Sequence, residues 1–461
     1  MDTTTSEPPT VPSGGNIYRR LLELAWPVIG LNVLNVLALA VDTAMIGRMD
    51  GADQALTGLG FSTQLLFLLM VLMMGLTVGS VAMIARAHGA EQPERVNHIL
   101  AQSSALTVIL SIIVAVLGHL LAEPLLRVLG AGPESAEAGM LYLRVMLTGV
   151  VFNYLNILYA AALRGVGETR LPFLISLGMN LLNALFNYGL ILGNLGLPAL
   201  GLRGAAIGTV TAQAIAVFTM VILLRRDVIS GVHLSLRPPP IDVGLARSLG
   251  RIGAPAALDM VVLNAGFLSI IGMLGRIDDI AVAAHGVGLR IQALAFVPGM
   301  SIGQATGAMV GNALGAHHPD EVRRITRAAM VLCAVSMTTL GMIFIIEAES
   351  LLGLFDIDHN TPLADYSVMW IRLLGLCMPA VSIYIALNGA FQGAGATRLS
   401  LRINILATVL IQIPLSWVLG FPLGMSAFGV WLAFPIALGL KSLMGIVVYR
   451  SSGWMKAGDR V

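Results

Sequence analysis

Charged residues are scarce in this chain of 461 residues, since Asp, Glu, Lys and Arg together make up 11% of it. Hydrophobic residues make up 57%, and the mean hydropathy is +0.85. A water-soluble protein of this length needs a polar surface, and this composition cannot supply one. The sequence therefore predicts a protein whose surface is covered by a lipid bilayer.

Cysteine is rare as well, because the chain has only Cys333 and Cys377, both within apolar segments. Neither a disulfide framework nor a metal site is expected from them. No basic stripe with interleaved aromatic residues is present, so nucleic-acid binding is not expected either. Residues 1–15 are polar and rich in Pro, Thr and Ser, which is typical of a disordered tail. No signal peptide is recognised before the first apolar run.

Long apolar segments are abundant. A bilayer core of about 30 Å requires about 20 apolar residues per helix. Twelve segments fit this length, near residues 23–47, 57–84, 99–121, 138–162, 171–193, 204–224, 252–274, 281–311, 327–346, 367–391, 402–421 and 427–449. The predicted fold is an all-α integral membrane protein with twelve transmembrane helices.

The arginines predict the orientation of these spans. With a cytoplasmic N-terminus, most basic residues of the loops and ends fall inside. The basic residues of the outer loops are then Arg48, Arg127, Arg203 and Arg276. This distribution satisfies the positive-inside rule, so both termini are expected in the cytoplasm.

The two halves of the chain resemble each other. GVGETRL at 165–171 returns as GAGATRL at 393–399, a shift of 228 residues. GAEQPERV at 89–96 returns as GAHHPDEV at 315–322, a shift of 226. The 228-residue shift also relates two further pairs, Gln64 with Gln292 and Arg144 with Arg372.

Six spans in each half predict two lobes related by a pseudo-two-fold along the membrane normal, with a site between them near mid-bilayer. The expected units are a tail (1–15), an N-terminal lobe (16–225), a cytoplasmic linker (226–248), a C-terminal lobe (249–450) and a C-terminal tail (451–461).

Several strings resemble the multidrug and toxic compound extrusion family over nearly the whole chain. They are WPVIGLNVLNVLALAVDTAMIGR in the first span, the paired GxGxTR loops, NLLNALFNYGLI in the fifth span, LGLRGAAIGT entering the sixth and MSAFGVWLA entering the twelfth. The Asp in the first span points to the DNA-damage-inducible-F-type branch. The resemblance implies an exporter of lipophilic or cationic compounds that is driven by inward flow of H⁺ or Na⁺.

The resemblance also implies a protein without a cofactor or a resident metal, and not an enzyme. Its expected location is the cytoplasmic (inner) membrane of a bacterium or archaeon, in contact with lipid. A monomer is expected.

Asp42 is the strongest functional candidate, because an acidic residue inside a membrane span is costly and by default indicates function. Asn35 lies seven positions earlier on the same helical face, so this face is expected to line a cavity. A carboxylate there can bind and release a cation or a proton during a transport cycle. The alternative is a structural carboxylate that caps a neighbouring helix or is neutralised by Arg.

The fifth span carries Asn183 and Asn187, four residues apart and therefore on one face. Relatives in the family often carry Asp at the position of Asn187. Because an amide cannot titrate, proton chemistry is expected to concentrate on Asp42. Thr209 and Tyr142 match further polar positions of the family. For the two asparagines the alternative is interhelical hydrogen bonding without a role in transport.

Three other residues are candidates with clear structural alternatives. Pro27 resembles the family proline that bends the first helix, and it is either a hinge or a fixed kink. Asp259, near mid-depth of the seventh span, and Arg290 are cavity candidates, or they form a structural ion pair with each other.

Other classes of function remain open at this stage. A flippase for lipid-linked precursors would have a related architecture, but usually with extra spans and a more cationic cavity. A lipid-modifying enzyme would need clustered His, Asp or Glu at one membrane face, and the local cluster is His317, His318, Asp320 and Glu321. A channel would need a repeated selectivity-filter string, which is not present.

Overall fold

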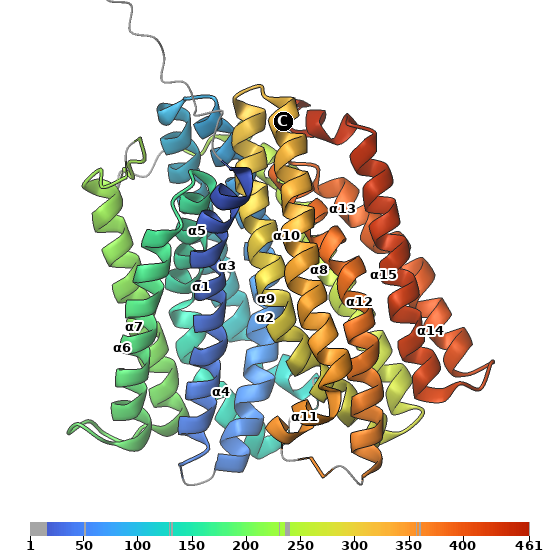
Figure 1. Cartoon of the computed structure of the whole chain (residues 1–461). Coiled ribbons are helices and arrows are strands. Elements are labelled where there is room, and N and C mark those ends of the chain that lie inside the picture. Colours follow the sequence, from blue (N-terminus) through green and yellow to red (C-terminus); the bar gives the residue numbers. More distant parts are fainter. Residues whose placement is uncertain are drawn as a thin grey trace, which may run out of the picture.

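The computed structural model describes residues 16–49, 52–128, 130, 132–229, 231–235, 240–355, 357–358 and 361–460 as a bundle of long helices (Figure 1). The expected disordered tail, 1–15, lies outside these residues. So do positions 230 and 236–239 of the expected linker.

The described residues of the first half of the chain form seven helices: α1 (Ile17–Ile46), α2 (Ala52–Gly89), α3 (Pro93–Val128), α4 (Pro133–Thr148), α5 (Val150–Gly165), α6 (Arg170–Leu192) and α7 (Gly201–Arg225). Helices α4 and α5 meet at Gly149 with a bend of 55° and together form the fourth predicted span. Gly149 is needed there because a Cβ at this position would collide with Val210 of α7.

The second half contains α8 (Val243–Gly275), α9 (Asp279–Gly315), α10 (Pro319–Ile346), α11 (Ala348–Leu352), the 3₁₀ turn η1 (Gly353–Phe355), α12 (Pro362–Gly393), α13 (Thr397–Asn404), the π-helix η2 (Ile405–Gln412), α14 (Ile413–Gly420), α15 (Ser426–Arg450) and the 3₁₀ segment η3 (Gly453–Arg460). Helix α13, η2 and α14 run without interruption and form the eleventh predicted span.

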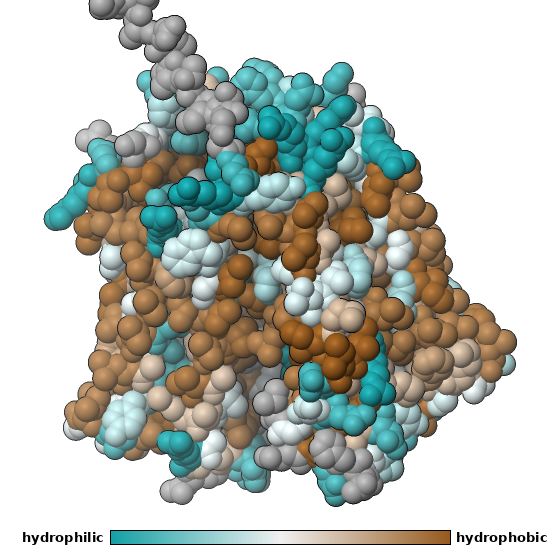
Figure 2. All heavy atoms as spheres, viewed as in Figure 1, coloured by the Kyte–Doolittle hydropathy of each residue, from teal (hydrophilic) through white to brown (hydrophobic). Residues whose placement is uncertain are grey.

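The helices have the length and composition of membrane spans. Across the described part of the chain, eleven are long and apolar enough to cross a bilayer, and the bent α4–α5 pair makes twelve. Hydrophobic residues dominate the middle of the face drawn in Figure 2, and hydrophilic residues gather at its two ends. Large apolar side chains point outward from the bundle, for example Leu120 at 69% and Leu181 at 65% exposure. The prediction of an all-α membrane fold is confirmed.

The helices form two lobes, one from each half of the chain, coloured blue to green and yellow to red in Figure 1. The first helix of each lobe packs against the second helix of the other, since α1 contacts α9 and α8 contacts α2. This reciprocal contact is what a two-fold relation between repeats requires. The predicted two-lobed architecture is therefore confirmed.

The lobes touch closely at one end of the bundle, which we call the terminal end because α1 begins there and η3 lies there; the opposite end is the distal end. Gly75 of α2 and Gly253 of α8 pack backbone to backbone, so that a Cβ on either would lie 2.5–2.6 Å from the carbonyl oxygen of the other. Arg20 of α1 forms an ion pair with Glu321 of α10 at 3.2 Å.

Two further hydrogen bonds join the lobes, one near the terminal end and one at mid-depth. Asn312 of α9 donates to the carbonyl of Gly165 at 2.9 Å. Asn32 of α1 donates to the hydroxyl of Ser301 of α9 at 3.0 Å, near the middle of both helices. These contacts lie between the terminal end and mid-depth, so the two lobes are joined in that part of the bundle.

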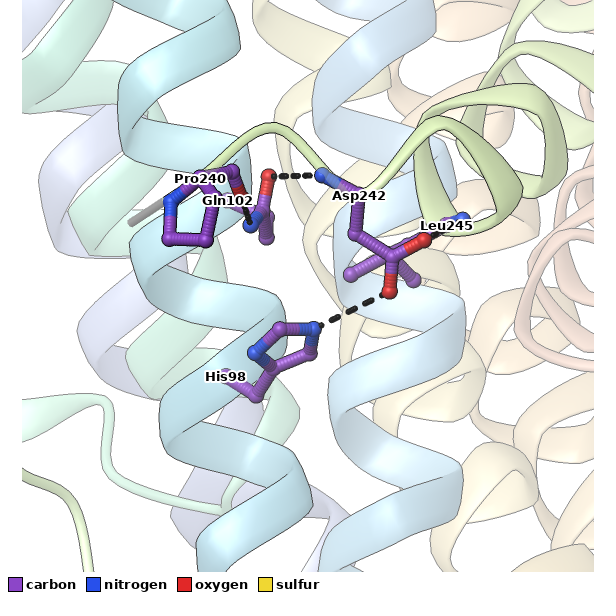
Figure 3. A network of polar contacts seen from close by, with 5 residues as sticks. All are labelled: His98, Gln102, Pro240, Asp242 and Leu245. Carbon is purple, nitrogen blue, oxygen red and sulfur yellow. Dashed lines mark hydrogen bonds and ion pairs between the residues drawn. The ribbon is translucent and has the colours of Figure 1, made fainter. Parts of the chain in front are cut away.

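The linker is fastened to the N-terminal lobe just before α8 begins (Figure 3). Gln102 of α3 donates to the carbonyl of Pro240 at 2.6 Å and accepts from the Asp242 amide at 3.2 Å. Asp242 caps α8 by accepting from the Leu245 amide at 3.0 Å, and its other oxygen lies 3.2 Å from His98 Nε2. The Leu245 amide and then His98 hold the pKa of Asp242 below its usual range.

Candidate functional site

Asp42 lies on α1, one turn before its distal end, and is partly buried. Its carboxylate accepts a hydrogen bond of 2.6 Å from the Asn187 side chain of α6. The α1 residues around it are largely exposed, with Leu37 at 55% and Leu39 at 53%. Asp42 lies ten residues beyond Asn32, which joins α1 to α9, and therefore in the distal half of the bundle.

The polar residues predicted from the fifth and sixth spans form a chain with Asp42. Asn187 donates its second amide hydrogen to Asn183, one turn away, at 3.4 Å. Asn183 donates to the hydroxyl of Thr209 on α7 at 3.0 Å. Thr209 in turn donates to the carbonyl of Ala205 at 2.9 Å. The structure thus brings Asp42, Asn183, Asn187 and Thr209 together across three helices.

Gly208 makes room for this chain, and sequence reasoning did not single it out. Asn187 is fully buried against α7, and a Cβ at Gly208 would collide with its side-chain oxygen. That oxygen has no hydrogen-bond partner within the described residues. The signal in the sequence was the glycine directly before Thr209 in GAAIGT.

Tyr142 also belongs to the surroundings of Asp42. It lies on α4, is 9% exposed, and packs in the apolar cluster that includes Ile46 and Leu202. The charge of Asp42 acts electrostatically on the Tyr142 hydroxyl.

Asn35 and Pro27 lie apart from the chain of hydrogen bonds. The Asn35 side chain is exposed on α1. Pro27 is buried inside α1, which continues as a helix on both sides of it. Beside Pro27, Trp26 packs edge-on against Phe173 of α6, with ring centroids 5.6 Å apart. A Cβ at Gly30 would also meet Phe173, so α1 lies tightly on α6 at this level.

The suggested pairing of Asp259 with Arg290 is not found. Asp259 is 2% exposed and accepts a hydrogen bond of 2.5 Å from Asn404 of α13. Lys441 of α15 is the cation whose charge acts on the Asp259 carboxylate. Arg290 is exposed on α9, and within the described residues no ion pair includes it. Lys441 is a single lysine inside the apolar twelfth span, and the sequence alone did not identify it as a neighbour of Asp259.

The chemistry available at Asp42 is that of one carboxylate surrounded by amides and a hydroxyl. Such a group can hold a proton, or it can contribute oxygens to a small cation. In the described part of the chain, no three His, Cys, Asp or Glu side chains gather as they would around a metal ion. A cavity of about 570 Å³ lies elsewhere, at the terminal end, lined among others by Arg20, His88 and Glu321.

A membrane-spanning bundle of two repeated lobes, with a polar chain buried in one of them, is the architecture of many secondary transporters. A sequence profile of the MatE family matches the chain twice, at residues 27–189 and 255–418. The chain belongs to the MatE family. The two matches begin 228 residues apart, which is the shift of the internal repeat.

Individual relatives agree with this assignment. The chain is 26% identical over 443 residues to a probable multidrug resistance protein NorM of Thermotoga maritima, covering 95% of this chain and 94% of that protein. It is 25% identical over 457 residues to a probable multidrug resistance protein YoeA of Bacillus subtilis, covering 98% of each. A crystal structure of MATE in the bent conformation matches with a TM-score of 0.88 at 20% identity, covering 96% of this chain and 98% of that one.

Proposed function

We propose that this protein is a secondary active exporter of lipophilic or cationic small molecules, coupled to inward flow of protons, with Asp42 as the coupling carboxylate. The observation that carries the proposal is the hydrogen bond from Asn187 to Asp42, in the distal half of the N-terminal lobe. The relatives named multidrug resistance proteins support the substrate class.

Protons fit this site better than Na⁺. A Na⁺ site needs several oxygens directed at one point, whereas Asn187 turns an N–H toward Asp42 and its oxygen toward Gly208. The amide hydrogen bond stabilises the carboxylate when it is charged. A proton removes that charge without any further ligand.

The mechanism follows from the cost of an unpaired buried charge. A charged Asp42 favours a state in which water or a cationic substrate reaches it. A protonated Asp42 is neutral and favours a state in which the lobe closes around it, with α1 bending near Pro27. Antiport requires such differential affinity, because a ligand shifts a conformational equilibrium only by binding one state better.

The contacts that join the lobes between the terminal end and mid-depth support a state that opens toward the distal end. We infer that the terminal end is cytoplasmic and that the protein resides in the inner membrane, with both termini inside. Membrane-impermeant thiol labelling of intact cells tests this. Glu134→Cys, in the first turn of α4, should react, and Gln92→Cys, between α2 and α3, should not. Reaction of Gln92→Cys from outside would reverse the orientation.

The coupling role is tested by Asp42→Asn, which keeps a side chain of the same shape and removes the proton site. Cells expressing this variant should lose ethidium efflux. The matched control is Asp53→Asn, which removes the same charge from an exposed position in the first turn of α2 and should leave efflux unchanged. Full efflux by Asp42→Asn at equal expression would remove Asp42 from the coupling role.

A further inference from the structure

A second polar cluster lies inside the C-terminal lobe. Asp259 of α8, Tyr384 of α12, Asn404 of α13 and Lys441 of α15 come together from four helices. All four are at least nine-tenths buried, with exposures of 2%, 6%, 1% and 7%. Two opposite charges in such a place are expensive unless each compensates the other.

The contacts give each charge a distinct neighbour. Asn404 donates to the Asp259 carboxylate at 2.5 Å. Lys441 Nζ lies 4.3 Å from the centre of the Tyr384 ring, in a cation–π arrangement. Within the described residues this ammonium has no hydrogen bond and no direct ion pair, and Asp259 is the carboxylate within its electrostatic range. The ring supports the positive charge independently of Asp259.

Other titratable groups on the helices packed against α8 lie away from the cluster. Toward the terminal end are Arg86 and His88 of α2, Glu94, Arg95 and His98 of α3, Arg247 and Arg251 of α8 itself, Arg398 and Arg402 of α13, and Tyr449 and Arg450 of α15. Toward the distal end are Asp53 of α2, His119, Glu123 and Arg127 of α3, and Asp279, His285 and Arg290 of α9. Lys441 is the charged group close enough to act electrostatically on Asp259.

Unsatisfied polar atoms lead from the cluster toward the terminal end. The Tyr384 hydroxyl lies beside the Asn404 side chain, and the Asn404 side-chain oxygen has no partner among the described residues. One turn nearer the terminal end, the same holds for Ser400 on α13 and Asn388 on α12. Buried polar atoms without a protein partner are normally bonded to ordered water. Water bound at the Asn404, Ser400 and Asn388 oxygens would connect the cluster with the terminal end.

The backbone beside the cluster is also unusual. Asn404 is the residue directly before the π-helix η2, Ile405–Gln412. Such π-helical segments are rare and occur frequently at functional sites.

We propose that Asp259 and Lys441 form a second proton-binding site, which exchanges protons with the terminal end through waters held by Ser400 and Asn388. The proton is taken up by the Asp259 carboxylate from water on this route, and Lys441 remains an ammonium supported by the Tyr384 ring. A proton binds the carboxylate without further ligands, whereas an alkali cation needs several oxygens directed at one point, and Asn404 directs an N–H at Asp259. Its part in transport rests on the function proposed above.

The proposal is tested in everted membrane vesicles, where the terminal end faces the bath under the proposed topology. Ethidium accumulation is driven by a fixed pH difference while the bath pH is varied. The informative variant is Asp259→Asn/Lys441→Met, which removes both charges and leaves no unpaired one. If Asp259 and Lys441 form a proton site, the double variant should fold, and its ethidium accumulation should no longer vary with bath pH as that of the wild type does. A structural ion pair predicts the wild-type rate and pH profile, which would overturn the proposal.

Ser400→Ala supplies a test that does not disturb either charge. The Ser400 hydroxyl has no protein partner among the described residues, so its removal should leave folding intact. It should lower the maximal accumulation rate severalfold and leave the ethidium KM unchanged, because it interrupts the hydrated route. A wild-type rate for Ser400→Ala would contradict the route, even if the double variant failed to fold.

The two proposals fail in different ways. If wild-type vesicles show no accumulation under a pH difference, the proton-coupled exporter is wrong. If wild-type vesicles accumulate ethidium, Asp42→Asn vesicles do not, and both C-lobe variants match the wild type, only the second proton site is wrong.

Discussion

The two lobes build the same kind of contact at different depths. In each, an Asp of the first helix accepts a hydrogen bond from an Asn of the fifth span, as Asp42 does from Asn187 and Asp259 from Asn404. Both pairs are separated by 145 residues. The second pair follows the first by 217 residues, which is 11 short of the 228-residue repeat. Eleven helical residues correspond to about three turns, or roughly 16 Å.

This displacement gives the pairs different surroundings. Asp42 is partly buried in the distal half, where the neighbouring residues of α1 are exposed. Asp259 is almost fully buried, with a lysine as its compensating charge. The repeat equivalent of Asp42 is Ile270, which is fully buried, and that of Asp259 is Leu31. The two halves therefore share the same arrangement of helices, but their acidic residues lie at positions that the repeat does not relate.

The largest expected effect comes from breaking the charge balance of the C-terminal lobe alone. Lys441→Met leaves Asp259 as an uncompensated buried carboxylate. We expect a loss of the order of 3 kcal/mol, the lower end for removing one member of a buried pair, since the two groups are not in direct contact. Asp42→Asn should change stability much less. Thermal unfolding in detergent measures both, and equal losses would contradict the difference between the lobes.

A smaller but more specific effect is expected from Gly208→Ala in the N-terminal lobe. The added methyl group would collide with the Asn187 oxygen and displace the amide from Asp42. Efflux of ethidium should fall severalfold at equal expression. The matched control is Gly178→Ala on α6, where no atom lies within 4 Å of an added Cβ. If both variants export normally, the position of Asn187 does not matter for transport.

Much of the N-terminal site could be predicted from the sequence. Asp42 and the two asparagines stand out because polar residues are rare in apolar spans, and helical spacing placed Asn183 and Asn187 on one face. That the first and fifth spans would meet at this depth came from the family resemblance. Periodicity alone does not tell which helices are neighbours.

The C-terminal site could not be predicted in the same way. Asp259 and Arg290 lie on consecutive helices, which made their pairing plausible, but the Arg290 side chain is exposed. The residue that contacts Asp259 is Asn404 of the fifth span, and Lys441 of the sixth span acts on it electrostatically without direct contact. The internal repeat indicates the contact with Asn404, because contact between the first and fifth spans in one lobe implies the same contact in the other. The role of Gln102 and Asp242 in fastening the linker depends on loop geometry, which no periodic pattern encodes.

The next variant makes the N-terminal pair fully acidic. Asn187→Asp places a second carboxylate beside Asp42, and two adjacent carboxylates resist ionising together. The pair should keep a proton to higher pH, so the pH profile of efflux should move in the alkaline direction while some transport remains. Efflux measured over a range of external pH gives the profile. An unchanged profile would mean that position 187 does not sense Asp42 during transport.

The smallest expected effect concerns the linker that joins the two lobes. Asp242→Ala removes the cap of α8 and the contact with His98, whereas Asp242→Asn can keep the hydrogen bond to the Leu245 amide. We expect tryptic cleavage of the linker to rise in Asp242→Ala and to change little in Asp242→Asn.

The pH dependence of this anchor has a defined sign. Because the pKa of Asp242 is lowered in the folded protein, its contribution is present above the ordinary pKa of Asp and is lost as the pH falls through the lowered value. Linker protection that depends on Asp242 should therefore be constant from pH 8 to about pH 5. Hydrogen exchange of the Leu245 amide, quenched after labelling across this range, measures it directly. A steep loss of protection near neutral pH would show that His98, rather than Asp242, controls how firmly the linker holds the lobes together.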